Sequence, residues 1–257
     1  MRFKLILTVK SEVFGNVLPA SYQYELSSCI HRKIMEQEEL CATWLARNGF
    51  SALSDYHTRL FSISNFYIPK IKVDRDRLCI LARRVQLWIS FLPTRGTEEL
   101  VRTIFQNAVL MIGDKISRVE FVVDEIVPCL PPDDGETQEY LALSPIVFVK
   151  RNGGGGFEYV GPDCPEYGDL FLNSVLNRYE AIYGVPYEGD PKFKFELLSE
   201  PKRKGIVVMR FTPSENKVIG FMYKFRLTLD PVLQHLIYET GLGDRTHFGF
   251  GCIELLR

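Results

Sequence analysis

The sequence predicts an α+β protein built from two tandem units, each with the element order β-α-β-β-α-β. Apolar runs with the twofold period of strands alternate with runs at helical spacing, in the same order in both halves of the chain. Pro131-Pro132 and the polar stretch 133–138 separate the halves and are typical of a linker. We therefore expect one unit over residues 1–130 and a second over residues 140–257.

The first unit opens on alternating apolar residues and continues at helical spacing. Leu26, Ile30 and Ile34 recur every four residues, which places them on one face of a helix. Asn48-Gly49 is a typical stop for the short helix that follows. The elements expected here are a strand over residues 2–10, a loop over 15–19, helices over 22–37 and 38–47, strands over 59–63, 78–81 and 85–91, a helix over 98–110 and a strand over 116–127.

The second unit repeats this order without repeating the sequence. Residues 151–156 end in four glycines and indicate a hairpin between two strands. The basic segment Lys202-Arg203-Lys204, inside residues 201–205, indicates the tip of another hairpin. Two such units side by side would leave a central cleft between their sheets. The elements expected here are strands over 146–149 and 157–160, a helix over 167–183, strands over 193–198, 206–211 and 218–229, a helix over 231–240 and a last strand over 251–255.

The composition excludes several classes of protein. Hydrophobic residues make up 46% and charged residues 25% of the chain, which is typical of a folded globular protein. No apolar run reaches eighteen residues and the N-terminus lacks a cleavage pattern, so we expect no membrane partner. Six cysteines and four histidines are scattered without metal-ligand spacing, which predicts reduced thiols in a cytoplasmic protein and neither a metal nor a cofactor.

The charges are unevenly distributed along the chain. The net charge of −1 argues against a generic basic nucleic-acid coat. Residues 192–226 nevertheless hold nine basic and three acidic side chains, whereas residues 120–139 hold seven acidic and no basic ones. Two interpretations stay open at this point: one positively charged face for a polyanion, or charges that simply alternate outward on ordinary strands.

A glycine cluster near the C-terminus follows the last expected helix and precedes the last expected strand. Glycines let backbone N–H groups approach an anion closely, and Arg245 adds a planar two-pronged donor, so this loop is a candidate for holding a phosphodiester backbone. The alternative is a helix cap followed by a kinked turn. The residues assigned to binding here are Gly241, Gly243, Arg245, His247, Gly249 and Gly251.

The histidines are the candidates for acid–base chemistry, because the pKa of imidazole lies near neutrality. They are His31 in the first helix, His57 in a polar stretch, His235 in the last helix and His247 in the glycine loop. RNA can be cleaved without a metal, since its 2′-OH attacks the adjacent phosphate when a base, an acid and a cation assist. Each histidine also has a structural interpretation, as a surface, loop or core residue.

Several short segments resemble motifs of one family. They are the glycine loop 241–251, Leu18-Pro19 with 22–27, Arg59-Leu60-Phe61-Ser62-Ile63-Ser64, Leu143-Ser144-Pro145-Ile146, 177–184 and Lys217-Val218-Ile219-Gly220. Through them the chain resembles the Cas-six family of CRISPR repeat-processing endoribonucleases, in the RAMP superfamily. The resemblance implies two tandem ferredoxin-like domains around a central RNA-binding cleft. It implies cleavage of precursor crRNA within the repeat by metal-independent 2′-OH attack, which yields mature guide RNA, and it leaves open a homodimer or assembly with other Cas effector subunits.

The resemblance carries over to the catalytic positions only in part. His31 stands where many members have a Tyr, and Ala46 stands where many have a His, although Ala cannot transfer protons. Arg59 matches a family Lys and is a charge stabiliser rather than a proton donor. We expect an engineered substitution of His by Ala at position 46, made to trap uncut RNA. The alternatives are a natural member that uses His31 or His57, or a non-catalytic repeat-RNA-binding or scaffold subunit.

Overall fold

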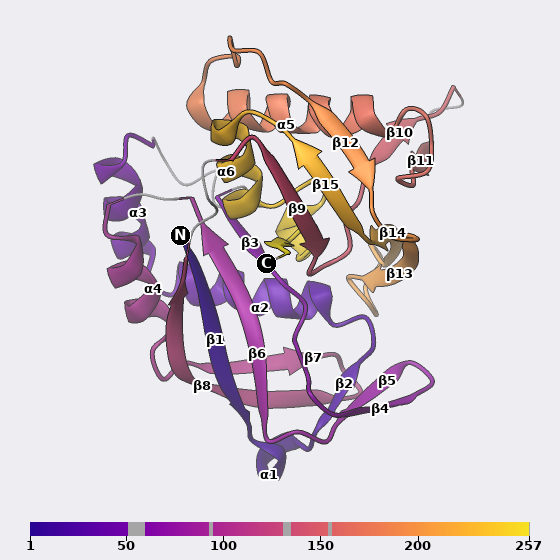
Figure 1. Ribbon diagram of the computed structural model, residues 1–257. Coiled ribbons are helices and arrows are strands. Elements are labelled where there is room, and N and C mark those ends of the chain that lie inside the picture. Colours follow the sequence, from indigo (N-terminus) through magenta and orange to yellow (C-terminus); the bar gives the residue numbers. More distant parts are fainter. Residues whose placement is uncertain (51–59, 93–94, 131–134, 154–155, 257) are drawn as a thin grey trace.

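Two antiparallel sheets, one in each half of the chain, form the frame of the protein in the computed structural model (Figure 1). The structure describes residues 1–50, 60–92, 95–130, 135–153 and 156–256. The elements of the first half are β1 (Arg2–Val9), α1 (Ser11–Phe14), β2 (Val17–Pro19), α2 (Gln23–Met35), α3 (Glu38–Arg47), β3 (Phe61–Ile63), β4 (Ile71–Asp74), β5 (Arg77–Ile80), β6 (Arg84–Phe91), α4 (Thr97–Phe105), β7 (Val109–Gly113) and β8 (Arg118–Cys129). Those of the second half are β9 (Thr137–Ala142), β10 (Val149–Arg151), β11 (Phe157–Tyr159), α5 (Tyr167–Tyr183), β12 (Lys194–Leu197), β13 (Lys202–Val208), β14 (Asn216–Met222), β15 (Lys224–Thr228), α6 (Pro231–Thr240), the 3-10 turn η1 (Thr246–Phe248) and β16 (Ile253–Leu255).

The strand orders confirm the predicted fold class. The first sheet has the order β3-β6-β1-β8-β7 and the second has the order β12-β15-β9-β16. Apart from the extra edge strand β7, the two orders are the same, and two helical segments connect the strands in each half. This is the ferredoxin-like arrangement, present twice. The domain boundaries at residues 130 and 140 remain predictions.

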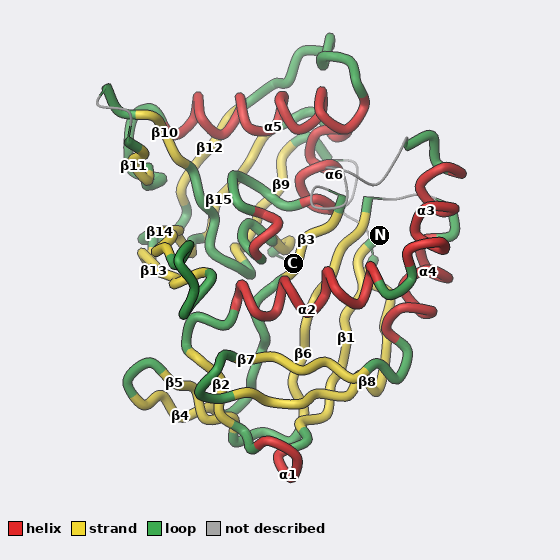
Figure 2. Tube along the Cα trace, turned by 180° about the vertical axis from the view of Figure 1, so that it is seen from behind, coloured by secondary structure: helices red, strands yellow, loops and turns green. Residues whose placement is uncertain are grey.

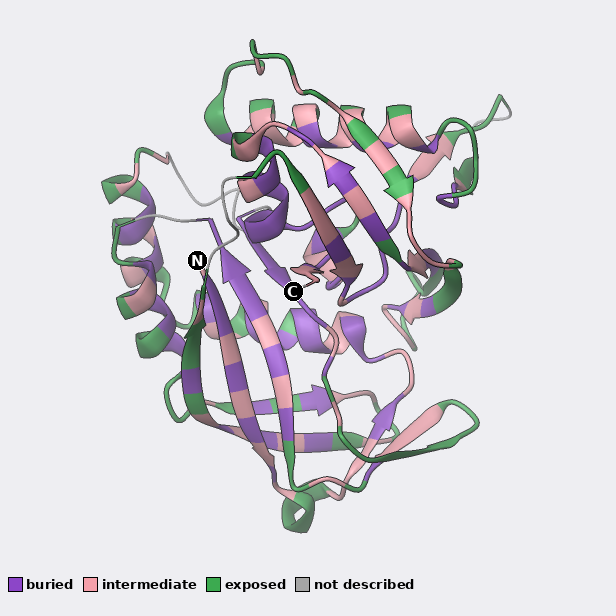
Figure 3. Ribbon diagram, in the orientation of Figure 1, coloured by how far each residue is buried: buried purple, intermediate pink, exposed green. Residues whose placement is uncertain are grey.

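Alternation along the strands decides which face of the first sheet is covered. Phe3, Leu5 and Leu7 of β1 are fully buried, whereas the residues between them are half-buried. Helix α2 crosses the buried face, as Figure 2 shows from behind. Figure 3 shows the same alternation as purple and pink bands along β1 and β6. Ile182 of α5 and Leu236 of α6 join this core, so apolar packing continues between the halves.

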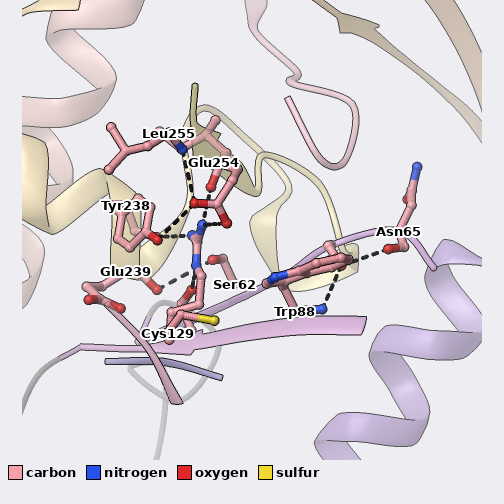
Figure 4. Close-up of polar contacts among 12 residues, drawn as sticks. Ser62, Asn65, Trp88, Cys129, Tyr238, Glu239, Glu254 and Leu255 are labelled. Atoms are coloured by element: carbon pink, nitrogen blue, oxygen red, sulfur yellow. Dashed lines mark hydrogen bonds and ion pairs between the residues drawn. The ribbon is translucent and has the colours of Figure 1, made fainter. Parts of the chain in front are cut away.

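A buried arginine joins the two halves. The guanidinium of Arg2 donates to the Tyr238 carbonyl at 2.6 Å and to the Ile253 carbonyl at 2.5 Å, and it lies 3.6 Å from the centroid of the Tyr238 ring. It also donates to Ser90 Oγ at 2.6 Å and pairs with Glu254. Figure 4 shows Tyr238 and Glu254 of the second half at this junction. A residue of the first strand is therefore tied to the last helix and the last strand.

The predicted hairpin around Lys202-Arg203-Lys204 is wrong. These residues open strand β13, which pairs with β14, and the connecting turn lies at residues 209–215. Strand β12, expected to pair with this segment, instead pairs with β15. Two further differences are that the helix expected over 98–110 ends at Phe105 before β7, and that the run 218–229 is divided between β14 and β15.

Candidate functional site

His31 lies on α2 beside the start of β3. Its ring is half-buried and meets the ring of Phe61 edge-on, with 4.9 Å between the ring centroids. Phe61 packs in turn against Phe91 of the neighbouring strand, at 5.7 Å between centroids. The first residues of β3 therefore hold the imidazole at the edge of the apolar core, where part of it remains accessible.

Ala46 occupies the last turn of α3. Trp44 and Leu45 of this helix are buried, whereas Ala46 is exposed, because it lies on the opposite side of the helix from the core. Arg59 and His57 lie outside the described residues.

The glycine loop has the predicted context of helix, loop and strand. Its four glycines all have positive φ, between 76° and 85°, and all four are buried. A Cβ atom on Gly243 would lie 2.5 Å from the Val147 carbonyl oxygen, and one on Gly251 would overlap the Leu242 carbonyl oxygen. The glycines are thus required by the tight path of the chain. The residues of the loop that reach its surface are Asp244, Arg245, His247 and Phe248.

Arg178 and Asp244 brace the loop from inside. Arg178 of α5 donates to the carbonyls of Gly243, at 2.6 Å, and Thr240, at 3.0 Å. The Asp244 carboxylate accepts from the Val149 N–H at 2.9 Å. Burial raises the pKa of the Asp244 carboxyl, and the Val149 N–H and Arg178 oppose that shift. Neither residue was a sequence candidate, although both lie inside motif segments named above, Arg178 in 177–184 and Asp244 in 241–251.

Replacement of Gly251 by Ala is expected to destabilise the protein by several kcal/mol. A left-handed backbone costs a non-glycine residue about 1–2 kcal/mol, and overpacking adds about 1–3 kcal/mol. Gly184→Ala is the matched control, because Gly184 has a left-handed backbone with a φ of 75° and nothing within 4 Å of an added Cβ. Urea unfolding would measure both variants. Equal losses of unfolding free energy for the two variants would show that the crowding at Gly251 is not significant.

The basic strand and the glycine loop belong to one packed unit. Lys202, Arg203 and Lys204 are exposed at the start of β13, and further along this strand Ile206 packs in a small apolar cluster with Phe250 of the loop. On β13, Arg203 points to the face opposite that of its two lysine neighbours. The strand that begins with the basic residues thus packs, through Ile206, against the glycine loop that was predicted separately. His235 lies apart from them, half-buried on α6.

The described residues contain no group of three or more His, Cys, Asp or Glu side chains that could hold a metal ion. None of the helices in the described ranges is both long and apolar enough to cross a membrane.

Comparisons with known proteins agree with this architecture. Residues 130–255 match the C-terminal domain family of the CRISPR-associated protein Cas6. The chain is 26% identical over 249 residues to an endoribonuclease-like Cas6nc protein of Pyrococcus horikoshii, covering 93% of this chain and 94% of that protein. It is 23% identical over 260 residues to the CRISPR-associated endoribonuclease Cas6 of Pyrococcus furiosus, covering 99% of this chain and 90% of that protein.

Solved structures show the same fold. A Cas6-related protein from Pyrococcus furiosus superposes with a TM-score of 0.80 at 24% identity, covering 100% of this chain and 98% of that one. A RAMP protein described as binding different RNA substrates superposes with a TM-score of 0.78 at 23% identity, covering 100% of both chains. Residues 130–255 therefore belong to the Cas6 C-terminal family, and over nearly its whole length the chain is similar to Cas6 proteins.

Proposed function

We propose that this protein binds CRISPR repeat RNA, and that its fold is that of a precursor-crRNA endoribonuclease whose catalytic position 46 is occupied by Ala. The observation that carries the proposal is the packed unit of glycine loop and basic strand, which presents Arg245, Lys202, Arg203 and Lys204 outward. The names of the relatives, one an endoribonuclease and others endoribonuclease-like, support the same substrate class.

In this proposal the first half, residues 1–130, carries the chemistry and the second half, residues 140–257, holds the RNA. The 2′-OH attacks the adjacent phosphate and forms a 2′,3′-cyclic phosphate, while the 5′-oxygen leaves and takes up a proton. His31 would serve as base or acid, and Arg59 would stabilise the charge on the phosphorane. Ala46 supplies no proton, so one of the two transfers lacks its partner.

Removal of a basic side chain from β13 tests the RNA interface. Arg203→Ala is expected to weaken binding of the repeat RNA and to reduce the slope of log affinity against log salt by about 0.7–0.9 for each phosphate that loses its cation. Arg84→Ala is the matched control, since Arg84 is an exposed strand arginine beside Asp124 and Glu125. Fluorescence anisotropy over a salt series would measure both. An unchanged affinity and slope for Arg203→Ala would contradict the assignment of this strand.

A second candidate function is a repeat-RNA-binding subunit without catalysis. Ala46 favours it, and relatives at 25% and 26% identity are called endoribonuclease-like. Fold alone does not separate the two functions, because activity depends on the site. A homodimer, assembly with other Cas subunits and a cytoplasmic location remain predictions.

A further inference from the structure

A cleft lies between α2, the end of β7 and the turn that connects β13 to β14. Two adjoining hollows of about 290 and 490 Å³ form it, and both are lined by Glu25, Asp114 and Arg118. Arg32 lines the first hollow, and Lys115 and Arg210 line the second. Four of these six side chains are cationic, so the cleft has the charge that a polyanion requires.

Two of the arginines are held in place by neighbours. The Arg210 guanidinium pairs with Asp76 at 2.7 Å and with Asp114 at 3.5 Å, which ties the β13–β14 turn to the first half. The Arg118 guanidinium lies 4.8 Å from the centroid of the Phe14 ring. Because these groups are ordered before any ligand arrives, binding would cost less conformational entropy than binding to free surface side chains.

Glu25 differs from Arg118 and Arg210 because one of its side-chain oxygens lacks a partner. Its Oε2 atom is buried and has no hydrogen-bond partner, although arginines line the same cleft. The ionised carboxylate with one buried oxygen unpartnered is costly, although its own backbone N–H binds the group, whereas the neutral acid is less costly and carries an O–H donor. The position of Glu25 is therefore suited to a ligand that supplies an acceptor.

We propose that this cleft binds a phosphodiester segment of the RNA, and that Glu25 enters the complex as the neutral acid, which donates its proton to a phosphate oxygen. The proposal rests on the RNA-binding function proposed above and adds to it a second contact region and a linkage to pH. A carboxylate beside a phosphate would repel it, so binding above neutral pH takes up one proton from solvent.

The electrostatic surroundings of Glu25 support this proton linkage. Burial raises the pKa of the carboxyl from its ordinary 4.5 to about 7, and Asp114 adds to that shift, whereas the residue's own backbone N–H, Arg210 and Arg77 oppose it. The charged groups that face Glu25 from the elements around it are Arg32, Arg77, Asp114, Lys115, Arg118 and Arg210. The free protein is thus close to half-protonated at this site at neutral pH.

The test is the affinity for fluorescein-labelled repeat RNA between pH 6 and pH 8 at constant ionic strength. A proton held in the complex and released from the free protein near pH 7 lowers the affinity about tenfold over this range. Glu25→Gln is expected to remove this dependence and to bind tightly at pH 8, because the amide keeps a donor without charge. Any other titrating group contributes equally to the wild type and to Glu25→Gln, so the comparison of the two isolates the effect of Glu25.

The arginine contact is tested independently of pH. Arg118→Gln is expected to weaken binding and to reduce the salt slope by about 0.7 for a single-stranded phosphate contact. Arg102→Gln is the matched control, since Arg102 is exposed on α4 and pairs with Glu98 one turn away. Thermal unfolding checks that each variant folds.

Glu25→Gln should stabilise the free protein at pH 8 but not at pH 4.5, because ionising Glu25 disfavours folding as pH rises towards 7.

The outcomes are distinct. Loss of affinity in Arg118→Gln and loss of pH dependence in Glu25→Gln support the proposal. An unchanged affinity and salt slope in Arg118→Gln overturn the cleft while leaving the proposed function intact. The same pH dependence in Glu25→Gln and wild type overturns the role of Glu25. If wild type binds no repeat RNA at all, the proposed function itself fails, and this inference with it.

Discussion

Ala46→His is expected to convert this chain into an active, metal-independent endoribonuclease. General acid–base catalysis by a positioned side chain contributes about 10²–10⁴-fold, so the variant should cut at least a hundredfold faster than the present chain. Ala46 is exposed in the last turn of α3, and the helix buries its opposite side through Trp44 and Leu45, so an imidazole there would be accepted without repacking. The assay uses end-labelled repeat RNA with EDTA present.

The control places the same imidazole elsewhere on the same helix. Thr43 is exposed one turn before Ala46, so Thr43→His adds a histidine of the same kind at the wrong position and should leave cleavage unchanged. His31→Ala in the Ala46→His background should lose most of the gained rate. Cleavage needs one group that takes the proton of the 2′-OH and another that gives a proton to the 5′-oxygen. Cleavage by the present chain at the rate of Ala46→His would mean that His31 or His57 suffices. Binding without cleavage by either chain would favour the non-catalytic subunit.

Local order along the chain was predictable, and the pairing of distant strands was not. The helix over 167–183 and the helix, glycine loop and strand over 231–255 were expected from apolar spacing and turn residues, and the structure confirms them. The basic hairpin was wrong because the alternation in 193–198 and 206–211 suits any neighbouring strand, and the partner is decided by the whole sheet.

The candidate site was also predictable only as far as local sequence decides it. Glycines in a loop are visible in sequence, but whether they face a ligand or the core depends on what packs over them, and here Val147 and Leu242 crowd them. The cleft around Glu25 was not predicted at all, because residues separated by up to 185 positions line it. No local pattern indicates that Glu25 and Arg210 share a cleft.

Arg2→Met is expected to destabilise the protein by about 3–5 kcal/mol, the cost of breaking a buried charged network by removal of one partner. Met fills much of the arginine volume, so the loss reports the polar contacts rather than a cavity. It leaves the carbonyls of Tyr238 and Ile253 and the Ser90 hydroxyl without their donor in a site where Arg2 is 1% exposed. Arg2→Lys keeps the charge but cannot reach several acceptors at once, so an intermediate loss is expected.

Arg226→Ala is the matched control, since Arg226 also pairs with two carboxylates, Glu139 at 2.7 Å and Glu196 at 2.8 Å, but its side chain is 40% exposed. An exposed pair contributes about 0–1 kcal/mol, so the two arginines should differ severalfold in equilibrium urea unfolding. Arg2 also joins β1 to α6 and β16, so its loss should reduce the cooperativity between the halves and lower the slope of the transition. A small loss of unfolding free energy in Arg2→Met, with an unchanged slope, would mean that apolar packing through Ile182 and Leu236 alone holds the halves together.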